Sequence, residues 1–245
     1  MDAAIVEQLR SKANAGIEAL KKRHPDQASV HFNSALELAE DVADARTRRD
    51  EVAVLSTLFE RCGFPDLALM AAEEAVELDR SLKLDGLLGQ DIIAVGNAHL
   101  KLENVAKAEG CFKEALETFV KRGDWANAAS ANTNMAAIVA NQGKMGKAIT
   151  LLEASLAYLA EAPFPDTEMQ TRFALMQAME FEGYDVDRAI ANAAELCARF
   201  WTDMREEQRA IARDFVDRAV KRYVQMHPQP KSSAWKAKRF PMLYK

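Results

Sequence analysis

Residues 92–119 read IIAVGNAHLKLENVAKAEGCFKEALETF, and the spacing of small and bulky residues in this stretch decides the fold. Its second half carries Ala108, Phe112 and Ala115 at i, i+4 and i+7, which places them on one face of a helix. The segment Leu102-Glu103-Asn104 separates the two halves and is typical of a turn. The stretch therefore predicts two antiparallel helices that meet at small side chains.

The same pattern recurs along the chain at a spacing of forty residues. The first small residue of each copy is Ala28, Ala68, Ala108 or Ala148. Twelve residues before each of these, the sequence has an apolar residue followed by a small one: Ala15-Gly16, Leu55-Ser56, Val95-Gly96 and Met135-Ala136. A fixed period of this length indicates stacked helix pairs, each of which buries its apolar face against its neighbours.

This arrangement resembles the tetratricopeptide repeat family. Its forty-residue period is longer than the usual repeat of about 34 residues, so it is most similar to the long-helix subgroup that includes polarity adaptors and kinesin light chains. The resemblance implies an all-α, right-handed superhelical array of about five antiparallel helix pairs with a C-terminal capping helix. We expect repeat units near residues 5–46, 47–86, 87–124, 125–162 and 166–201, a capping helix at 202–226 and a basic, aromatic tail at 227–245.

Two details of the predicted helices come from local sequence. Asp203 with Glu206 is typical of an N-terminal capping pair for the last helix. After it, an apolar stripe is predicted at Ile211, Phe215, Ala219 and Tyr223. We interpret the segment 86–89 (Gly-Leu-Leu-Gly) as the connector between the second and third units, since no strand precedes it to form a nucleotide loop.

Sequence signatures of catalysis, metal binding and cofactor binding are missing. There is no GxGxxG, P-loop or HExxH motif, and the four histidines show no ligand spacing. His99 falls at the aromatic position of its repeat, so a packed imidazole is expected there. Cys62, Cys111 and Cys197 form no CxxC and are expected as reduced, packed thiols. We therefore expect a non-enzymatic protein without cofactor or metal.

The charge distribution limits the class of partner. Residues 227–245 carry five bases and no acid, whereas the rest of the chain has 27 bases against 37 acids. An acidic body is a poor ligand for a phosphate backbone, so nucleic acid is not expected as a partner. The absence of a leader and of a long apolar run predicts a cytoplasmic protein without a membrane span.

The resemblance implies that the first helix of each pair lines a groove that holds a client peptide. Carried over position by position, the groove residues are Arg10, Asn14, Lys21, Arg61, Asn97, Lys101, Asn134 and Asn141, with Ile17, Asp50, Thr57, Gln90, Ser130 and Thr133 beside them. Asparagine amides both donate and accept hydrogen bonds, which suits a peptide backbone. Four of these residues are cations and only one is an acid, which predicts an acidic client.

Two functions remain open from sequence. The first is a scaffold or adaptor that binds a client peptide in this groove. The second is a structural subunit of a larger assembly that uses the convex face and the C-terminal tail. The tail itself is expected to dock on the body of its own chain, to engage a second copy, or to contact an anionic surface, because its aromatic residues are costly to leave in water.

Overall fold

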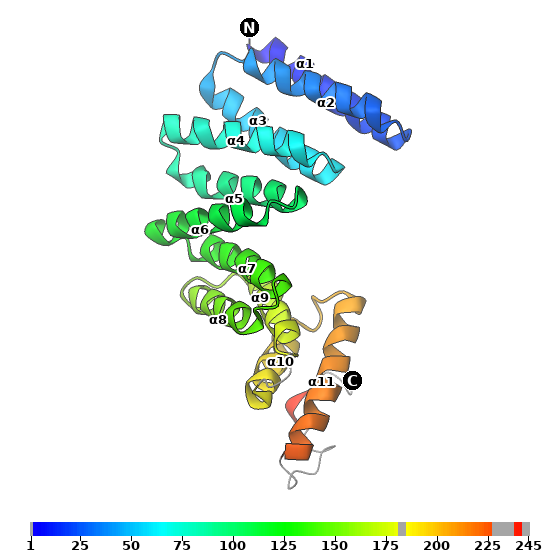
Figure 1. The fold of residues 1–245 in the computed structure, drawn as a ribbon, viewed down its shortest axis with the longest axis vertical. Helices are drawn as coiled ribbons and strands as arrows, with labels where there is room; N and C mark the ends of the chain where they lie inside the picture. The colour runs from blue at the N-terminus through cyan, green and yellow to red at the C-terminus, as the bar shows by residue number, and fades with distance from the viewer. Residues whose placement is uncertain (1, 181–184, 227–237, 242–245) are drawn as a thin grey trace. The chain divides into compact units, whose positions relative to one another are not determined.

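A computed structural model describes residues 2–180, 185–226 and 238–241, and within these ranges it contains helices and no strand (Figure 1). The all-α prediction is confirmed. The helices are α1 (Asp2–Lys21), α2 (Pro25–Glu40), α3 (Ala45–Cys62), α4 (Pro65–Leu82), α5 (Asp85–Lys101), α6 (Val105–Arg122), α7 (Trp125–Asn141), α8 (Met145–Glu161), α9 (Pro165–Ala178), α10 (Val186–Phe200) and α11 (Glu206–Met226). None of the described helices is long and apolar enough to cross a membrane.

The chain divides into two compact units, residues 1–123 and residues 124–245. In the first unit, α1 packs on α2, α3 on α4 and α5 on α6, and α4 also packs on α5 (Figure 1). In the second unit, α7 packs on α8, and both helices contact α9. Helix α10 contacts both α9 and α11. Each unit is thus built from helices that contact their neighbours in sequence.

Small residues permit the close approach of paired helices, as the repeat pattern predicts. A Cβ atom added to Gly96 in α5 would lie 2.7 Å from Cε1 of Phe112 in α6, and Gly16 faces the ring of Phe32 in the same way. Both phenylalanine rings are fully buried. Glycine in the first helix therefore provides the space that phenylalanine in the second helix occupies.

The turns inside the helix pairs repeat a left-handed backbone conformation. Arg23, Gly63, Glu103 and Gly143, which are spaced by forty residues, have φ angles of 62°, 80°, 60° and 76°. A left-handed residue just after a helix turns the chain so that the next backbone N–H groups donate hydrogen bonds to the carbonyl oxygens of the last helical turn. Gly63, for example, donates to the carbonyl oxygen of Glu60 at 3.1 Å.

The segment 86–89 is not a connector, because it lies in the first turns of α5. Gly89 is buried, and an added Cβ would lie 2.7 Å from Cζ of Phe119. The two glycines of this segment resembled a loop in the sequence, but Gly89 serves the same close packing as Gly96.

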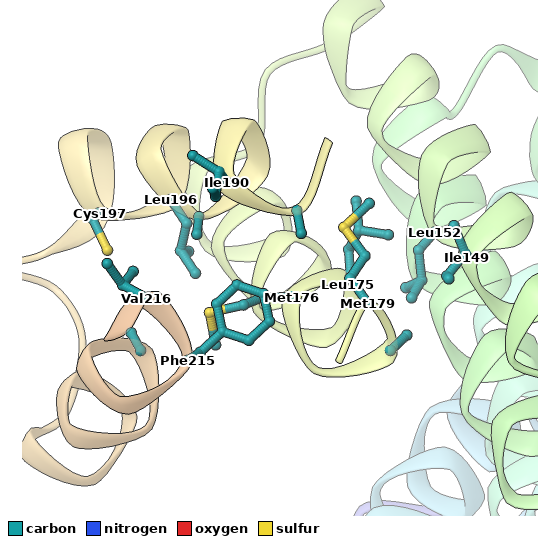
Figure 2. Packing of buried hydrophobic residues seen from close by; sticks show 14 of the residues in the cluster. Ile149, Leu152, Leu175, Met176, Met179, Ile190, Leu196, Cys197, Phe215 and Val216 are labelled. Atoms are coloured by element: carbon teal, nitrogen blue, oxygen red, sulfur yellow. The ribbon is translucent and has the colours of Figure 1, made fainter. Parts of the chain in front are cut away.

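The core of the second unit joins α7 to α11. Figure 2 shows Leu152 of α8 near Leu175 of α9 and near Met179, which directly follows α9, and Leu196 of α10 near Val216 of α11. On α11 the buried face consists of Ala212, Phe215, Val216 and Val220.

The predicted stripe on α11 is therefore partly wrong, since Ile211 is 42% exposed. The packed face is rotated by one residue at its start, toward Ala212. The predicted capping pair is also replaced. Gln208 accepts a hydrogen bond from the backbone N–H of Arg205 at 3.0 Å, which is the side-chain half of a capping box.

The C-terminal segment contributes one residue to this core. Phe240 is fully buried and belongs to the same apolar cluster as Phe215, Val216 and Val220. The prediction that the tail docks on its own chain is met at this position. The other aromatic tail residues, including Trp235, lie outside the described residues.

Candidate functional site

A groove of about 910 Å³ runs across the first helices of the first unit. We call it the α1–α3–α5 groove, because α1, α3 and α5 each contribute one face to its lining. The lining consists of Leu9, Arg10, Ala13, Asn14, Ile17, Arg49, Asp50, Glu51, Ala53, Val54, Leu55, Thr57, Leu58, Arg61, Leu87, Gln90, Asp91 and Ala94. On α1 and α5 these residues recur at spacings of three and four, so each helix presents a single stripe to the groove.

Half of the predicted site residues in the first unit line this groove. Arg10, Asn14 and Arg61 do, as do Ile17, Asp50, Thr57 and Gln90, which the family positions also implied. Lys21, Asn97 and Lys101 are not among the lining residues. Lys21 instead pairs with Glu18 of its own helix at 2.7 Å.

Asn134 and Asn141 belong to α7 in the second unit. Asn134 is half-buried and Asn141 is exposed at the end of the helix. Neither of them is among the lining residues of the α1–α3–α5 groove.

The apolar part of the groove was not singled out from the sequence. Val54 on α3 is 63% exposed, although it is a large aliphatic residue. Leu58 and Leu87 lie in the same lining and are half-buried. Val54 follows Asp50 by four residues and precedes Thr57 by three, so helical spacing from the predicted residues could have found it.

The predicted row of four cations is not assembled in this groove. Arg10 is exposed, but its guanidinium donates to both carboxylate oxygens of Glu51, which is 5% exposed. This hydrogen bond and the charge of Glu51 raise the pKa of Arg10. Arg61 makes no ion pair within the described ranges, so it is the lining cation that keeps its charge available.

A buried charge cluster forms one wall of the groove. The guanidinium of Arg49 on α3 donates to Asp79 of α4 at 2.7 Å and also contacts Asp91 of α5. Burial raises the pKa of Asp91 to about 7, the charge of Arg49 opposes this, and the neighbouring Asp79 adds to it. One guanidinium thus serves two buried carboxyl groups, and its charge offsets only part of the effect of burial on Asp91.

The candidate catalytic side chains are packed. His99 is 5% exposed, and its Nδ1 has no hydrogen-bond partner among the described residues. Burial raises the pKa of Cys197 to about 11, so this thiol stays protonated at neutral pH. Cys62 and Cys111 are half-buried free thiols. Residues 2–180, 185–226 and 238–241 contain no group of three or more His, Cys, Asp and Glu side chains that could hold a metal ion.

Comparisons with known proteins find the fold in solved structures only. No family model matches the sequence, and no curated protein matches it. The apo form of RapI superposes with a TM-score of 0.70 at 12% identity, over 89% of this chain and 64% of RapI. The chain thus spans less than two thirds of that protein.

Two further structures have the same architecture. The TPR-like repeats of a putative kinesin light chain from Podosopora anserina match with a TM-score of 0.60 at 14% identity, over 81% of this chain and 97% of that one. The Rap conjugation gene regulator of plasmid pLS20, in complex with the Phr* peptide, matches with a TM-score of 0.58 at 12% identity, over 88% of this chain and 62% of that one. Together with the helix pairs and their forty-residue period, these likenesses show that the chain has the tetratricopeptide-like helical-repeat fold.

Proposed function

We propose that this protein is a non-catalytic interaction module and that the α1–α3–α5 groove holds an extended segment of a client protein. The observation that carries the proposal is the groove itself, with a volume of about 910 Å³ and an exposed aliphatic residue, Val54, in its lining. A large aliphatic side chain left 63% exposed inside a concave lining favours contact with an apolar side chain of another molecule.

The polar lining residues suit a peptide backbone. Asn14 on α1 and Gln90 on α5 are exposed. Each amide both donates and accepts, so each can pair with an N–H and a C=O of an extended strand of chain. Amides on both outer helices and aliphatic residues between them would fix the direction and depth of the peptide.

Arg61 supplies the charge preference in this proposal. Arg10 is already paired with Glu51, and Arg49 is shared between Asp79 and Asp91. A client carboxylate beside Arg61, from Asp, Glu or a free C-terminus, would form a charge-assisted hydrogen bond. We therefore propose a client with one carboxylate next to an apolar residue. The pLS20 regulator, a protein of the same fold, was solved with the Phr* peptide bound, which is consistent with peptide binding but says nothing about this chain's client.

The alternative is a structural subunit that docks through its second helices. It is favoured by Val30 on α2 and Met70 on α4, which are 64% and 55% exposed and stand forty residues apart at the same repeat position. Such a row of exposed apolar side chains on successive second helices would also suit a permanent neighbour.

One pair of variants separates the two functions. Val54→Glu and Val30→Glu each place a charge on an equally exposed valine, so neither is expected to lower the melting temperature by more than about 2–4 °C. Partners are captured from native lysate and quantified by mass spectrometry. Val54→Glu should reduce client capture about tenfold or more, whereas Val30→Glu should leave it unchanged.

The opposite result, in which Val30→Glu alone loses partners that co-purify at a fixed ratio, would favour the structural subunit. Arg61→Glu tests the charge preference, with Lys101→Glu as its control because Lys101 lies outside the lining. Loss of capture in both, or in neither, would contradict the proposed contact to a carboxylate.

A further inference from the structure

A second concave surface of the first unit lies between two of the second helices. We call it the α4–α6 cleft. It has a volume of about 660 Å³ and is lined by Glu73, Val76, Glu77 and Arg80 of α4, Ile92, Val95 and His99 of α5, and Lys107, Gly110, Cys111 and Glu114 of α6. No residue of this lining also lines the α1–α3–α5 groove.

Helix periodicity shows why α5 serves both surfaces. Leu87, Asp91 and Ala94 face the groove, whereas Ile92, Val95 and His99 face the cleft. At 3.6 residues per turn, the two stripes are about 120° apart around the helix. The walls of the cleft come from α4 and α6, each of which contributes residues at i, i+3, i+4 and i+7, and the ion pair from Nη2 of Arg80 to Oε1 of Glu114, at 2.7 Å, joins the two walls.

The floor of the cleft is apolar and closely packed. Val76, Ile92 and Val95 are 8% exposed or less. His99 lines the same cleft, and its buried Nδ1 has no partner within the described part of the chain. In contrast, a Cβ added to Gly110 on the wall would meet no atom within 4 Å. The cleft therefore offers an apolar floor with open space above it.

The charge of the cleft is negative on balance. Glu73 and Glu77 make no ion pair with the described residues, and Glu114 is shared with Arg80. Lys107 is the opposing cation of the lining. Burial raises the pKa of Cys111, the charges of Glu114 and Glu73 raise it further, and the charge of Lys107 lowers it.

We propose that the α4–α6 cleft binds a lysine or arginine side chain presented by a partner protein. The alkyl stem would pack on Val76, Ile92 and Val95, and the cationic head would pair with Glu73 and Glu77 at the rim. Long basic side chains combine an apolar stem with a charged head, which matches an apolar floor beneath free carboxylates. This surface is separate from the groove of the proposed function and does not depend on it.

The test uses the full-length chain and two synthetic probes, Ac-Ala-Arg-Leu-Ala-NH2 and the same peptide with glutamine in place of arginine. Binding is followed by NMR through the ring signals of His99 and the backbone signals of Gly110. We expect the arginine peptide to bind about tenfold more tightly than the glutamine peptide and to shift both sets of signals. Equal binding of the two probes, or shifts that map elsewhere, would overturn the proposal.

Three variants give effects of different sign. Glu73→Gln with Glu77→Gln should abolish the preference for arginine, and Glu117→Gln, an exposed acid of α6 outside the lining, should preserve it. Lys107→Gln should strengthen arginine binding several-fold, because it removes the opposing cation. If the Lys107 variant weakens binding, or the Glu117 variant loses the preference, the assigned geometry is wrong.

A steric variant is independent of charge. Gly110→Leu should block the cleft and lose binding without loss of helicity, because leucine favours a helix more than glycine. Gly146→Leu on α8 is the matched control, since its added Cβ also meets no atom within 4 Å. The tail of a second copy is the competing source of the cation. If the chain self-associates and Glu73→Gln with Glu77→Gln makes it monomeric, the cation comes from the tail, and the assignment to a partner protein is overturned.

Discussion

At the residue scale, the helix pairs are specified by matched volumes across each crossing. Gly16 faces Phe32 and Gly96 faces Phe112, whereas in the second pair Ser56 donates from Oγ to the carbonyl oxygen of Ala68 at 3.2 Å. The residue of the second pair equivalent to Phe32 and Phe112 is Ala72, so that pair has serine and alanine where the other two have glycine and phenylalanine.

Gly96→Ala tests this packing. Alanine favours a helix over glycine by about 1 kcal/mol, but its Cβ would lie 2.7 Å from a fully buried ring and overpack the crossing by about 1–3 kcal/mol. We expect a lower melting temperature, and partial recovery when Phe112→Leu is added. Gly146→Ala, which has open space around it, should be neutral or stabilising. A stabilised Gly96→Ala protein would show that the two helices are not in close contact there.

The buried cluster around Arg49 predicts a pH dependence of stability. Burial raises the pKa of Asp91 from 3.8 to about 7 in the folded state. A raised folded-state pKa means that the native state holds a proton the unfolded chain releases. Its contribution to stability is complete below pH 3.8 and is lost as the pH rises through about 7.

Asp91→Asn should therefore flatten the fall in melting temperature between pH 5 and pH 8, as followed by circular dichroism. Asp50→Asn is the control, because Asp50 is an exposed carboxylate beside the same guanidinium, at 3.3 Å. An unchanged slope in the Asp91 variant would show that Arg49 keeps both carboxyl groups ionised.

At the element scale, the backbone conformation at the helix ends repeats every forty residues, whereas the amino acid at that position varies. The turn after α1, α3, α5 and α7 has a left-handed residue at positions 23, 63, 103 and 143, but only two of these are glycine. A residue with a Cβ costs about 1–2 kcal/mol in this conformation. Arg23 and Glu103 are therefore strained positions held by the packing of the helices around them.

Glu103→Gly should raise the free energy of unfolding by up to about 1 kcal/mol, and Gly63→Ala should lower it by about 1–2 kcal/mol. Both changes are measured by urea denaturation. We therefore expect the free energy of unfolding to change in opposite directions in these two variants, although the two turns are equivalent. A destabilised Glu103→Gly protein would mean that the glutamate side chain contributes more than the backbone strain costs.

The same elements show what the sequence could predict. The forty-residue period located the helix pairs and the turns, because both depend on local spacing. The positions carried over from the resembled family gave Arg10, Asn14 and Arg61, and these three residues line the groove. The sequence did not reveal Glu51 and Asp91 as the partners of Arg10 and Arg49, because these contacts depend on which residues meet between the first helices of successive pairs. Of the four predicted cations, Arg10 is paired with Glu51, and Lys21 and Lys101 are not among the lining residues of the groove.

At the scale of the whole molecule, the C-terminal segment is part of the fold of the second unit. Phe240 is fully buried with residues of α11 that the chain placed about twenty positions earlier. Burial of a phenylalanine side chain contributes about 1.5–3 kcal/mol. Phe240 is therefore part of the apolar core of the second unit.

Phe240→Ala should destabilise the second unit by about 3–5 kcal/mol. In hydrogen exchange, α9 to α11 should lose protection, and the first unit should keep it. Lys238→Ala, two residues away and exposed, should leave both patterns unchanged. Uniform loss of protection over both units would contradict the division into two compact units.

Site-specific photocrosslinking shows whether a client segment binds in the α1–α3–α5 groove or on the second helices. A benzoylphenylalanine is placed at Val54 in the α1–α3–α5 groove, or at Val30 on α2, two positions with nearly the same exposure. After irradiation in native lysate, the crosslinked peptides are identified by mass spectrometry. We expect position 54 to capture one recurring segment with an apolar residue next to an Asp, a Glu or a C-terminus, and we expect no capture of this segment at position 30. Capture of that segment at position 30 and not at position 54 would contradict this expectation.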